Sequence, residues 1–281
     1  MRRKTTAVRI GNVVLSSEEP VLVQSMLNTS TREVDACVEQ AIRIIEAGGR
    51  LVRITAPGVK EAEMLGEIHR RLRERGYTTP ISADIHFVAE AASVAARYVE
   101  KVRINPGNFA DKRATFKKLT YTDEEYAAEL EILRQKFTEF LEVCRQYGTA
   151  VRIGTNHGSL SDRIMSRYGD TPAGMVEATM EYLRVCQACD FKDVVISLKS
   201  SDCRTMVDAV RLLVEKMEAE GMCYPLHLGV TEAGEGEDGR IRSAVGIGTL
   251  LNEGIGDTIR VSLTEEPEAE IPVACELARS I

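Results

Sequence analysis

The stretch "KVRINPGN" (residues 101–108) has the pattern of a β-strand with a charged residue in its centre. Successive side chains of a strand point to opposite faces, so Arg103 and Asn105 share one face while Val102 and Ile104 share the other. The same phrase recurs in "LVRITA" (51–56), "AVRIGTN" (150–156) and "DTIRVSL" (257–263). Four strands are therefore expected to carry an arginine opposite their apolar residues.

Strand-like runs of this kind alternate with helical patterns along the whole chain. Strands are expected at residues 21–26, 51–56, 80–87, 101–106, 150–156, 193–200, 224–232 and 257–263. Helices are expected at residues 33–49, 58–75, 87–98, 124–147, 172–189, 204–220 and 241–254, and from about Pro267 onward. Eight consecutive βα units in 281 residues predict an α/β fold of the (β/α)8 TIM-barrel type, as one domain over residues 1–281.

Two segments stand outside this repeat. A β-hairpin with Gly-Asn at its turn is expected at residues 6–18, before the first barrel strand. The polar insertion at residues 108–130 follows the fourth strand and is expected to form a surface loop that leads into a long fourth helix.

The composition limits the classes of function. The net charge is −7, with 43 acidic and 36 basic residues, and the basic residues are spread along the chain. Both features argue against electrostatic binding of nucleic acid. No apolar run is long enough for a membrane span or a signal peptide, so a cytoplasmic protein is expected. The seven cysteines are an odd number and favour reduced thiols.

In a TIM barrel, the inward face at the C-terminal ends of the strands lines the active site. In the four predicted strands that carry an arginine, the apolar residues are expected on the helix-facing side: Val52, Ile54, Val102, Ile104, Val151, Ile153, Ile259 and Val261. The inward face then carries Arg53, Arg103, Arg152 and Arg260, with Asp84 and His86 in the third strand and Ser197 and Lys199 in the sixth. In the seventh strand His227, Gly229 and Thr231 share one face, and Glu232 follows at the strand end.

Five basic side chains would thus meet at the barrel mouth, and we call them the basic ring: Arg53, Arg103, Arg152, Lys199 and Arg260. Their mutual repulsion and desolvation cannot be offset by Asp84 and Glu232 alone, so an anionic ligand is expected. Arginine binds phosphate oxygens in pairs, and the glycine-rich residues 243–257 are expected to add backbone N–H donors. These features predict a small diphosphorylated substrate. Arg9 repeats the phrase in the hairpin but is expected to face solvent.

An ordered set of motifs resembles the barrel domain of the 4-hydroxy-3-methylbut-2-enyl diphosphate synthase family. The motifs are "VLVQSM", "SADIHF", "VRINPGN", "VRIGTNHGSL", "ISLKSSD", "LHLGVTEAG", "SAVGIGTLL" and "DTIRVSLT". The long insertion resembles the three-domain branch of this family. The resemblance implies reductive opening of 2-C-methyl-D-erythritol 2,4-cyclodiphosphate with loss of water, in non-mevalonate isoprenoid biosynthesis. It also implies a [4Fe-4S] cluster, flavodoxin or ferredoxin as the electron donor, and a homodimer.

The resemblance also assigns roles to residues of this sequence. The diphosphate would be held by Arg53, Arg103, Arg152, Lys199, Arg260 and Ser262, with assistance from Asn105 and Asn156. Asp84 and His86 would lie beside the substrate hydroxyls. Glu232 would be the catalytic acid that delivers the proton for the departing water.

The family's cluster ligands, three cysteines and a glutamate, belong to a separate C-terminal domain for which this sequence shows no motif. The chain is therefore expected to bind substrate without turning it over alone, and to contain no metal ligands. Cys186 and Cys189 fall in an expected helix outside the barrel and are interpreted as packed thiols, as are Cys203 and Cys223.

Three other interpretations stay open. A metal-dependent barrel hydrolase or aldolase would use His86, His157 and His227 beside the strand-end carboxylates. A pterin-binding barrel of the dihydropteroate synthase kind shares the fold but would not explain so many arginines. A barrel that binds a diphosphate without catalysis is the third.

Overall fold

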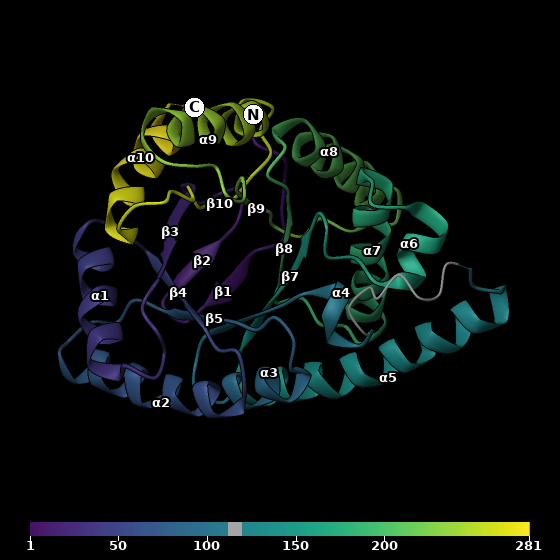
Figure 1. Ribbon diagram of the computed structural model, residues 1–281, viewed down its shortest axis with the longest axis horizontal. Coiled ribbons are helices and arrows are strands. Elements are labelled where there is room, and N and C mark those ends of the chain that lie inside the picture. The colour runs from purple at the N-terminus through teal and green to yellow at the C-terminus, as the bar shows by residue number, and fades with distance from the viewer. Residues whose placement is uncertain (112–119, 281) are drawn as a thin grey trace.

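Eight parallel strands form a barrel in the computed structural model, which describes residues 1–111 and 120–280 (Figure 1). The strands are β3 (Leu22–Met26), β4 (Leu51–Thr55), β5 (Ile81–Asp84), β6 (Lys101–Ile104), β7 (Ala150–Asn156), β8 (Val194–Lys199), β9 (His227–Leu228) and β10 (Thr258–Ile259). They pair in the order β8-β7-β6-β5-β4-β3-β10-β9, and a parallel bridge between Ile196 and Leu226 closes the circle. The predicted TIM barrel is confirmed.

Helices surround this barrel on its outside (Figure 1). They are α1 (Val34–Glu46), α2 (Val59–Glu74), α3 (Ala89–Ala95), α4 (Pro106–Phe109), α5 (Asp123–Tyr147), α6 (Asp162–Tyr168), α7 (Pro172–Ala188), α8 (Cys203–Ala219), α9 (Gly236–Asn252) and α10 (Pro267–Arg279). The short helices α4 and α6 were not predicted, because each is a single or double turn in a βα connection, too short to show a helical period.

The long helix after the insertion is confirmed as α5. Its start is fixed by a capping box, in which the Thr122 hydroxyl accepts from the Glu125 N–H and the Glu125 carboxylate accepts from the Thr122 N–H. Gly148 ends it in the left-handed region, with a φ of 67°. Residues 112–119 of the predicted surface loop lie outside the described residues.

The two faces of each strand separate as the period of two predicts. All eight residues predicted to face the helices belong to the main apolar core between barrel and helices. The opposite face turns Arg103 and Arg152 into the barrel, where they are 3% and 2% exposed. The inward arginines therefore follow directly from strand geometry.

The N-terminal hairpin closes one end of the barrel. Strands β1 (Val8–Ile10) and β2 (Val13–Leu15) pair across a turn at Gly11, whose φ is +56°. Their inner residues pack on the inward side chains nearest the strand starts, in a second apolar cluster: Val8, Ile10, Val13, Leu15, Leu22, Leu51, Ala150 and Val195. Arg9 points to solvent, as predicted. The basic ring thus has an apolar floor beneath it.

Across the described ranges, no helix is both long and apolar enough to pass through a membrane.

Candidate functional site

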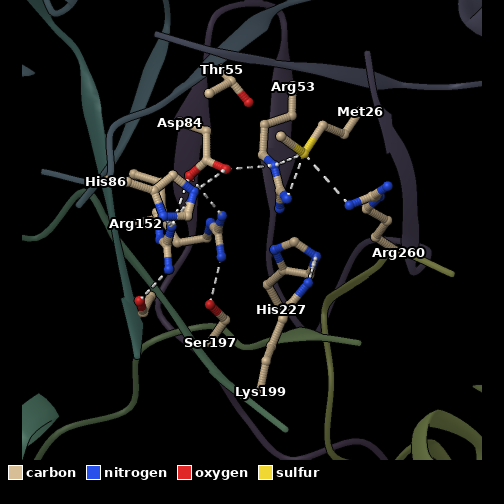
Figure 2. Close-up of polar contacts among 12 residues, drawn as sticks. Met26, Arg53, Thr55, Asp84, His86, Arg152, Ser197, Lys199, His227 and Arg260 are labelled. Atoms are coloured by element: carbon tan, nitrogen blue, oxygen red, sulfur yellow. Dashed lines mark hydrogen bonds and ion pairs between the residues drawn. The ribbon is translucent and has the colours of Figure 1, made fainter. Parts of the chain in front are cut away.

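Asp84 lies at the centre of the inward polar groups and is 1% exposed (Figure 2). Its Oδ1 is 3.0 Å from Arg103 Nη1 and 4.0 Å from Arg152 Nη2, and its Oδ2 is 3.4 Å from Arg53 Nε. Burial by itself would raise the pKa of this carboxyl, but Arg53 and Arg103 outweigh it and hold the pKa well below the usual range. Asp84 therefore stays ionised and ties three strands of the ring together.

Arg103 of β6 and Arg152 of β7 both lie over Gly154, which is two residues after Arg152 on β7. Arg103 Nη2 donates to the Gly154 carbonyl at 2.7 Å, and Arg152 Nη1 donates to Ser197 Oγ at 2.6 Å. A Cβ on Gly154 would lie 2.6 Å from Arg103 Nε and 3.0 Å from Arg152 Nη1. Glycine thus leaves room here for the two guanidinium groups. No sequence pattern distinguishes Gly154 from the other glycines of the chain.

Arg260 is held by a carboxylate that the sequence analysis did not foresee. Glu270 of α10 is 1% exposed, and its two oxygens each lie 3.0 Å from a nitrogen of Arg260. The Ser25 hydroxyl also donates to Glu270 at 2.7 Å. Between Arg53 and Arg260 lies Met26, whose Sδ is 2.7 Å from Arg53 Nη2 and 3.5 Å from Arg260 Nη1 (Figure 2). These contacts order the β3 and β10 side of the ring.

Lys199 and His227 occupy the β8 and β9 side. Lys199 Nζ is 3.5 Å from His227 Nε2, and both side chains are buried. A Cβ on Gly229, just after β9, would lie 2.7 Å from Lys199 Nζ and 2.9 Å from the Arg260 carbonyl oxygen, so glycine leaves room here for the lysine amine. His227 thus faces Lys199 inside the barrel (Figure 2).

Lys101 lies one inward position below Arg103 and is 0% exposed. Among the described residues its Nζ has no hydrogen-bond partner. Burial, followed by the charges of Arg152 and Arg53, lowers the pKa of this amine well below that of an ordinary lysine. The sequence analysis missed Lys101, although the same period of two that found Arg103 identifies it.

The remaining predicted site residues lie at or near the C-terminal rim. His86 Nε2 is 3.2 Å from Asp84 Oδ2 and 3.1 Å from Arg103 Nη1. Asn105 is buried, and its amide caps α4 at Gly107 N and donates to Ser159 Oγ at 2.9 Å. The amide of Asn105 is thus used to fix the loop after β6.

Asn156 ends β7, Ser262 follows β10, and both are partly exposed. Glu232 is exposed in the loop after β9, with a φ of +52°. A positive φ is unfavourable for a glutamate and marks a position that the surrounding loop imposes.

The prediction that residues 243–257 supply phosphate-binding N–H groups is wrong. Residues 243–252 lie inside α9, where backbone N–H groups bond to carbonyls of the preceding turn. The following loop leads into the start of β10, and the Gly254 carbonyl accepts from the Arg3 N–H there. This loop lies at the hairpin end of the barrel, away from the ring, because it precedes its strand.

The interpretation as a metal-dependent hydrolase or aldolase depends on where His86, His157 and His227 lie. His86 contacts Asp84, His227 contacts Lys199, and His157 Nε2 lies 3.6 Å from Asp170 Oδ1. The three imidazole groups thus contact different partners. In residues 1–111 and 120–280 no group of three or more His, Cys, Asp or Glu residues is placed to hold a metal.

Cys186 and Cys189, the chain's one C-x-x-C pair, are packed in the protein. Cys186 is 0% exposed on the core side of α7, and burial raises the pKa of its thiol well above the ordinary value. Cys189 is partly exposed at the end of the same helix and packs against the core. Cys186 does not fit a cluster-ligand set, because a buried thiol of raised pKa does not offer a thiolate.

The charges of the site do not balance. The ring and Lys101 contribute six basic groups, and Asp84 and Glu270 contribute two acidic ones. Buried cations without partners are costly, whereas an anion with several oxygens can accept hydrogen bonds from forked arginines on several strands at once. The arrangement is therefore suited to a small polyanion at the C-terminal end of the barrel.

Comparisons with curated proteins point in the same direction. A protein of Parabacteroides distasonis named 4-hydroxy-3-methylbut-2-en-1-yl diphosphate synthase (flavodoxin) is 64% identical over 276 residues, which are 98% of this chain and 45% of that protein. An Arabidopsis thaliana protein named 4-hydroxy-3-methylbut-2-en-1-yl diphosphate synthase (ferredoxin), chloroplastic, is 53% identical over 278 residues, 99% of this chain and 38% of that protein. The chain spans less than half the length of these relatives.

Solved structures share the fold at low identity. Dihydropteroate synthase of Yersinia pestis matches with a TM-score of 0.62 and 12% identity, covering 98% of both chains. Type I 3-dehydroquinate dehydratase of Clostridium difficile matches with a TM-score of 0.60 and 11% identity, covering 99% of both chains. At such identity only the barrel is shared, so the pterin-binding interpretation gains support for its fold and none for its function.

Residues 5–275 match the family described as the GcpE TIM-barrel domain. This match extends over nearly the whole chain, and the similar curated proteins carry the enzyme name that the motifs suggested. The chain therefore belongs to the GcpE TIM-barrel family.

Proposed function

We propose that this chain is the substrate-binding barrel of a 4-hydroxy-3-methylbut-2-en-1-yl diphosphate synthase, and that its basic ring holds 2-C-methyl-D-erythritol 2,4-cyclodiphosphate. The observation that carries the proposal is the excess of basic over acidic groups inside the barrel, where five buried basic residues and the partly exposed Arg260 face only Asp84 and Glu270. A cyclic diphosphate supplies the missing negative charge and several acceptor oxygens. The names of relatives at 53–64% identity support the same ligand class.

The geometry divides the ring into two working parts. Arg103 and Arg152, held over Gly154, present donor groups to the diphosphate oxygens, and Lys199 adds a point charge from the next strand. The buried Asp84 and His86 at the rim lie 3.2 Å apart, and together they can accept from and donate to the substrate hydroxyls. The permanent charges of Arg103 and Arg152 need no rearrangement when the negative charge arrives.

Glu232 is the proposed proton donor. It is exposed beyond β9 rather than buried in the ring, so its carboxyl can reach a substrate that stands above the diphosphate cradle. In the proposed reaction the cyclic diphosphate is opened by two electrons, and the departing hydroxyl leaves as water after it receives a proton. The imposed backbone of Glu232 supports a positioned role for this side chain.

A [4Fe-4S] cluster would supply the electrons, with flavodoxin or ferredoxin as the external donor named for the relatives. The described residues do not fit the cluster, so the part of this chain is to bind and orient the substrate. We also propose that the protein forms a homodimer and is located in the cytoplasm. The seven cysteines are all free, which is consistent with a reducing compartment.

Calorimetric titration with the cyclodiphosphate tests the proposal. We expect binding on the order of micromolar for the wild-type chain. Arg103→Ala and Arg152→Ala should each weaken it by about ten- to hundredfold, because each removes charged hydrogen bonds to the ligand. Circular dichroism confirms that each variant is folded.

Arg9→Ala is the matched control. Arg9 occupies the same "VRI" phrase but faces solvent on the hairpin, so its removal should leave the affinity unchanged. Equal losses in all three variants, or no binding by the folded wild-type chain, would contradict the assignment of the ring to this ligand.

A further inference from the structure

Lys199 and His227 form a contact between two bases inside the barrel (Figure 2). Their Nζ and Nε2 atoms lie 3.5 Å apart, and the two residues are 4% and 1% exposed. Within residues 1–111 and 120–280, His227 is the hydrogen-bond partner of the lysine amine, and His227 Nδ1 has none. A hydrogen bond between two bases needs only one proton, so the pair need not be fully charged.

The charged groups that face this pair come from most strands of the barrel. The basic ones are Arg53 on β4, Lys101 and Arg103 on β6, Arg152 on β7 and Arg260 beside β10. The acidic ones are Asp84 on β5, paired with Arg53 and Arg103, and Glu270 on α10, paired with Arg260. Glu232 is exposed beyond β9. The lysine amine therefore faces several cations, and the nearby carboxylates are already taken by arginines.

This environment opposes a charge on either base. Burial, followed by the surrounding arginines, lowers the pKa of Lys199 well below that of an exposed lysine. Burial, followed by Lys199 and Arg152, likewise lowers the pKa of His227. An anion that enters the ring would offset the surrounding positive charge and favour the protonated amine.

We propose that His227 is the positioning residue of Lys199: it accepts the hydrogen bond of the amine in the ligand-free barrel, and the amine takes up a proton from solvent when the diphosphate binds. The inference rests on the proposed function and deepens it. The proton forms an N–H bond with the nitrogen lone pair, and the resulting ammonium donates to a phosphate oxygen. No bond of the ligand is broken, and a cyclic diphosphate, unlike a phosphate monoester, has no second ionisation near neutral pH that could supply the proton.

The test is calorimetric titration of the chain with the cyclodiphosphate at about pH 8, in two buffers of different ionisation enthalpy. The difference in heat gives the protons exchanged, and we expect uptake of about one proton per ligand. Over the pH range in which free Lys199 is neutral, the affinity should fall about tenfold per pH unit. Binding without proton uptake at any pH in this range would overturn the inference alone. No binding by the folded chain would overturn the proposed function and the inference with it.

Variants separate the roles of the two bases. Lys199→Arg carries a permanent charge, so its binding should lose both the proton uptake and the pH dependence. His227→Leu removes the acceptor, which destabilises the ammonium, so the fall in affinity should begin at lower pH than in the wild type. His227→Gln should restore part of this shift, because an amide oxygen can accept from the amine.

Two outcomes would contradict this assignment. If His227→Leu weakens binding by one constant factor at every pH, the histidine is only a packing residue. If proton uptake persists in Lys199→Arg and disappears in Lys101→Met, the deeper lysine takes the proton instead.

Discussion

At Lys101 the demands of ligand binding and of stability are opposed. The amine is fully buried below Arg103, and it has no hydrogen-bond partner among the described residues. Such a group costs free energy in the ligand-free chain, whether it is charged or neutral. A residue of this kind is typical of sites whose electrostatics are arranged for a ligand.

Replacing this amine should therefore stabilise the ligand-free protein. Lys101→Met keeps the length of the side chain and removes the unpaired nitrogen, so the free energy of unfolding should rise by about 1–3 kcal/mol. Urea titration measures the change. Lys192→Met, at an amine whose side chain is 70% exposed, should leave the stability unchanged. A destabilised Lys101→Met chain would show that the amine has an unrecognised partner.

The second prediction about a single residue concerns Gly154. A methyl group there would lie 2.6 Å from Arg103 Nε, so Gly154→Ala should displace the guanidinium groups of Arg103 and Arg152. Overpacking of this kind costs about 1–3 kcal/mol, and we expect the loss to appear mainly in affinity for the cyclodiphosphate. The control is Gly248→Ala in α9, where a Cβ would meet nothing within 4 Å. Equal affinity of the two variants would refute the proposed crowding.

At the scale of elements, the hairpin β1–β2 acts as the floor of the site. Ile10 is 0% exposed and packs on inward residues at the starts of the barrel strands, so the hairpin seals the interior from the end opposite the ring. An apolar floor excludes water and thereby strengthens the electrostatic interactions of the ring above it.

Ile10→Ala should destabilise the chain by about 2–5 kcal/mol, because it leaves a cavity in this second core. Arg9→Ala changes the adjacent, exposed residue of the same strand and should alter the stability by less than about 0.5 kcal/mol. Chemical denaturation of both variants checks the expectation. Similar small effects would mean that the hairpin only covers the barrel.

At the scale of the whole molecule, the basic ring draws its residues from β4, β6, β7, β8 and the end of β10. Asp84 of β5 pairs with arginines of β4 and β6, and Glu270 of α10 pairs with Arg260. A polyanion should relieve this repulsion and tighten the entire barrel. A ligand present at a hundred times its Kd should stabilise the folded chain by about 2.7 kcal/mol.

Thermal unfolding at increasing cyclodiphosphate concentration measures this stabilisation as a rise in Tm. Arg103→Ala should show a smaller rise at the same concentration, and Arg9→Ala should match the wild type. A Tm that is independent of the ligand, for a chain shown to be folded, would contradict binding to the native barrel.

The sequence by itself determined the barrel and the inward direction of its arginines. Both follow from local geometry: the alternation of βα units specifies the architecture, and the strand period of two fixes the face of Arg53, Arg103, Arg152 and Arg260. The same period of two also places Lys101 on the inward face of its strand, although Lys101 was not among the predicted site residues.

Only the tertiary structure decided the partners. Glu270 reaches Arg260 because α10 packs against β3, and Lys199 meets His227 because the barrel closes between β8 and β9. Residues 243–257 failed as a phosphate loop because most of them form α9 and the rest lead to the opposite end of the barrel. Periodicity fixes the direction of a side chain along its own element, whereas contacts between elements depend on closure and packing, which no local pattern records.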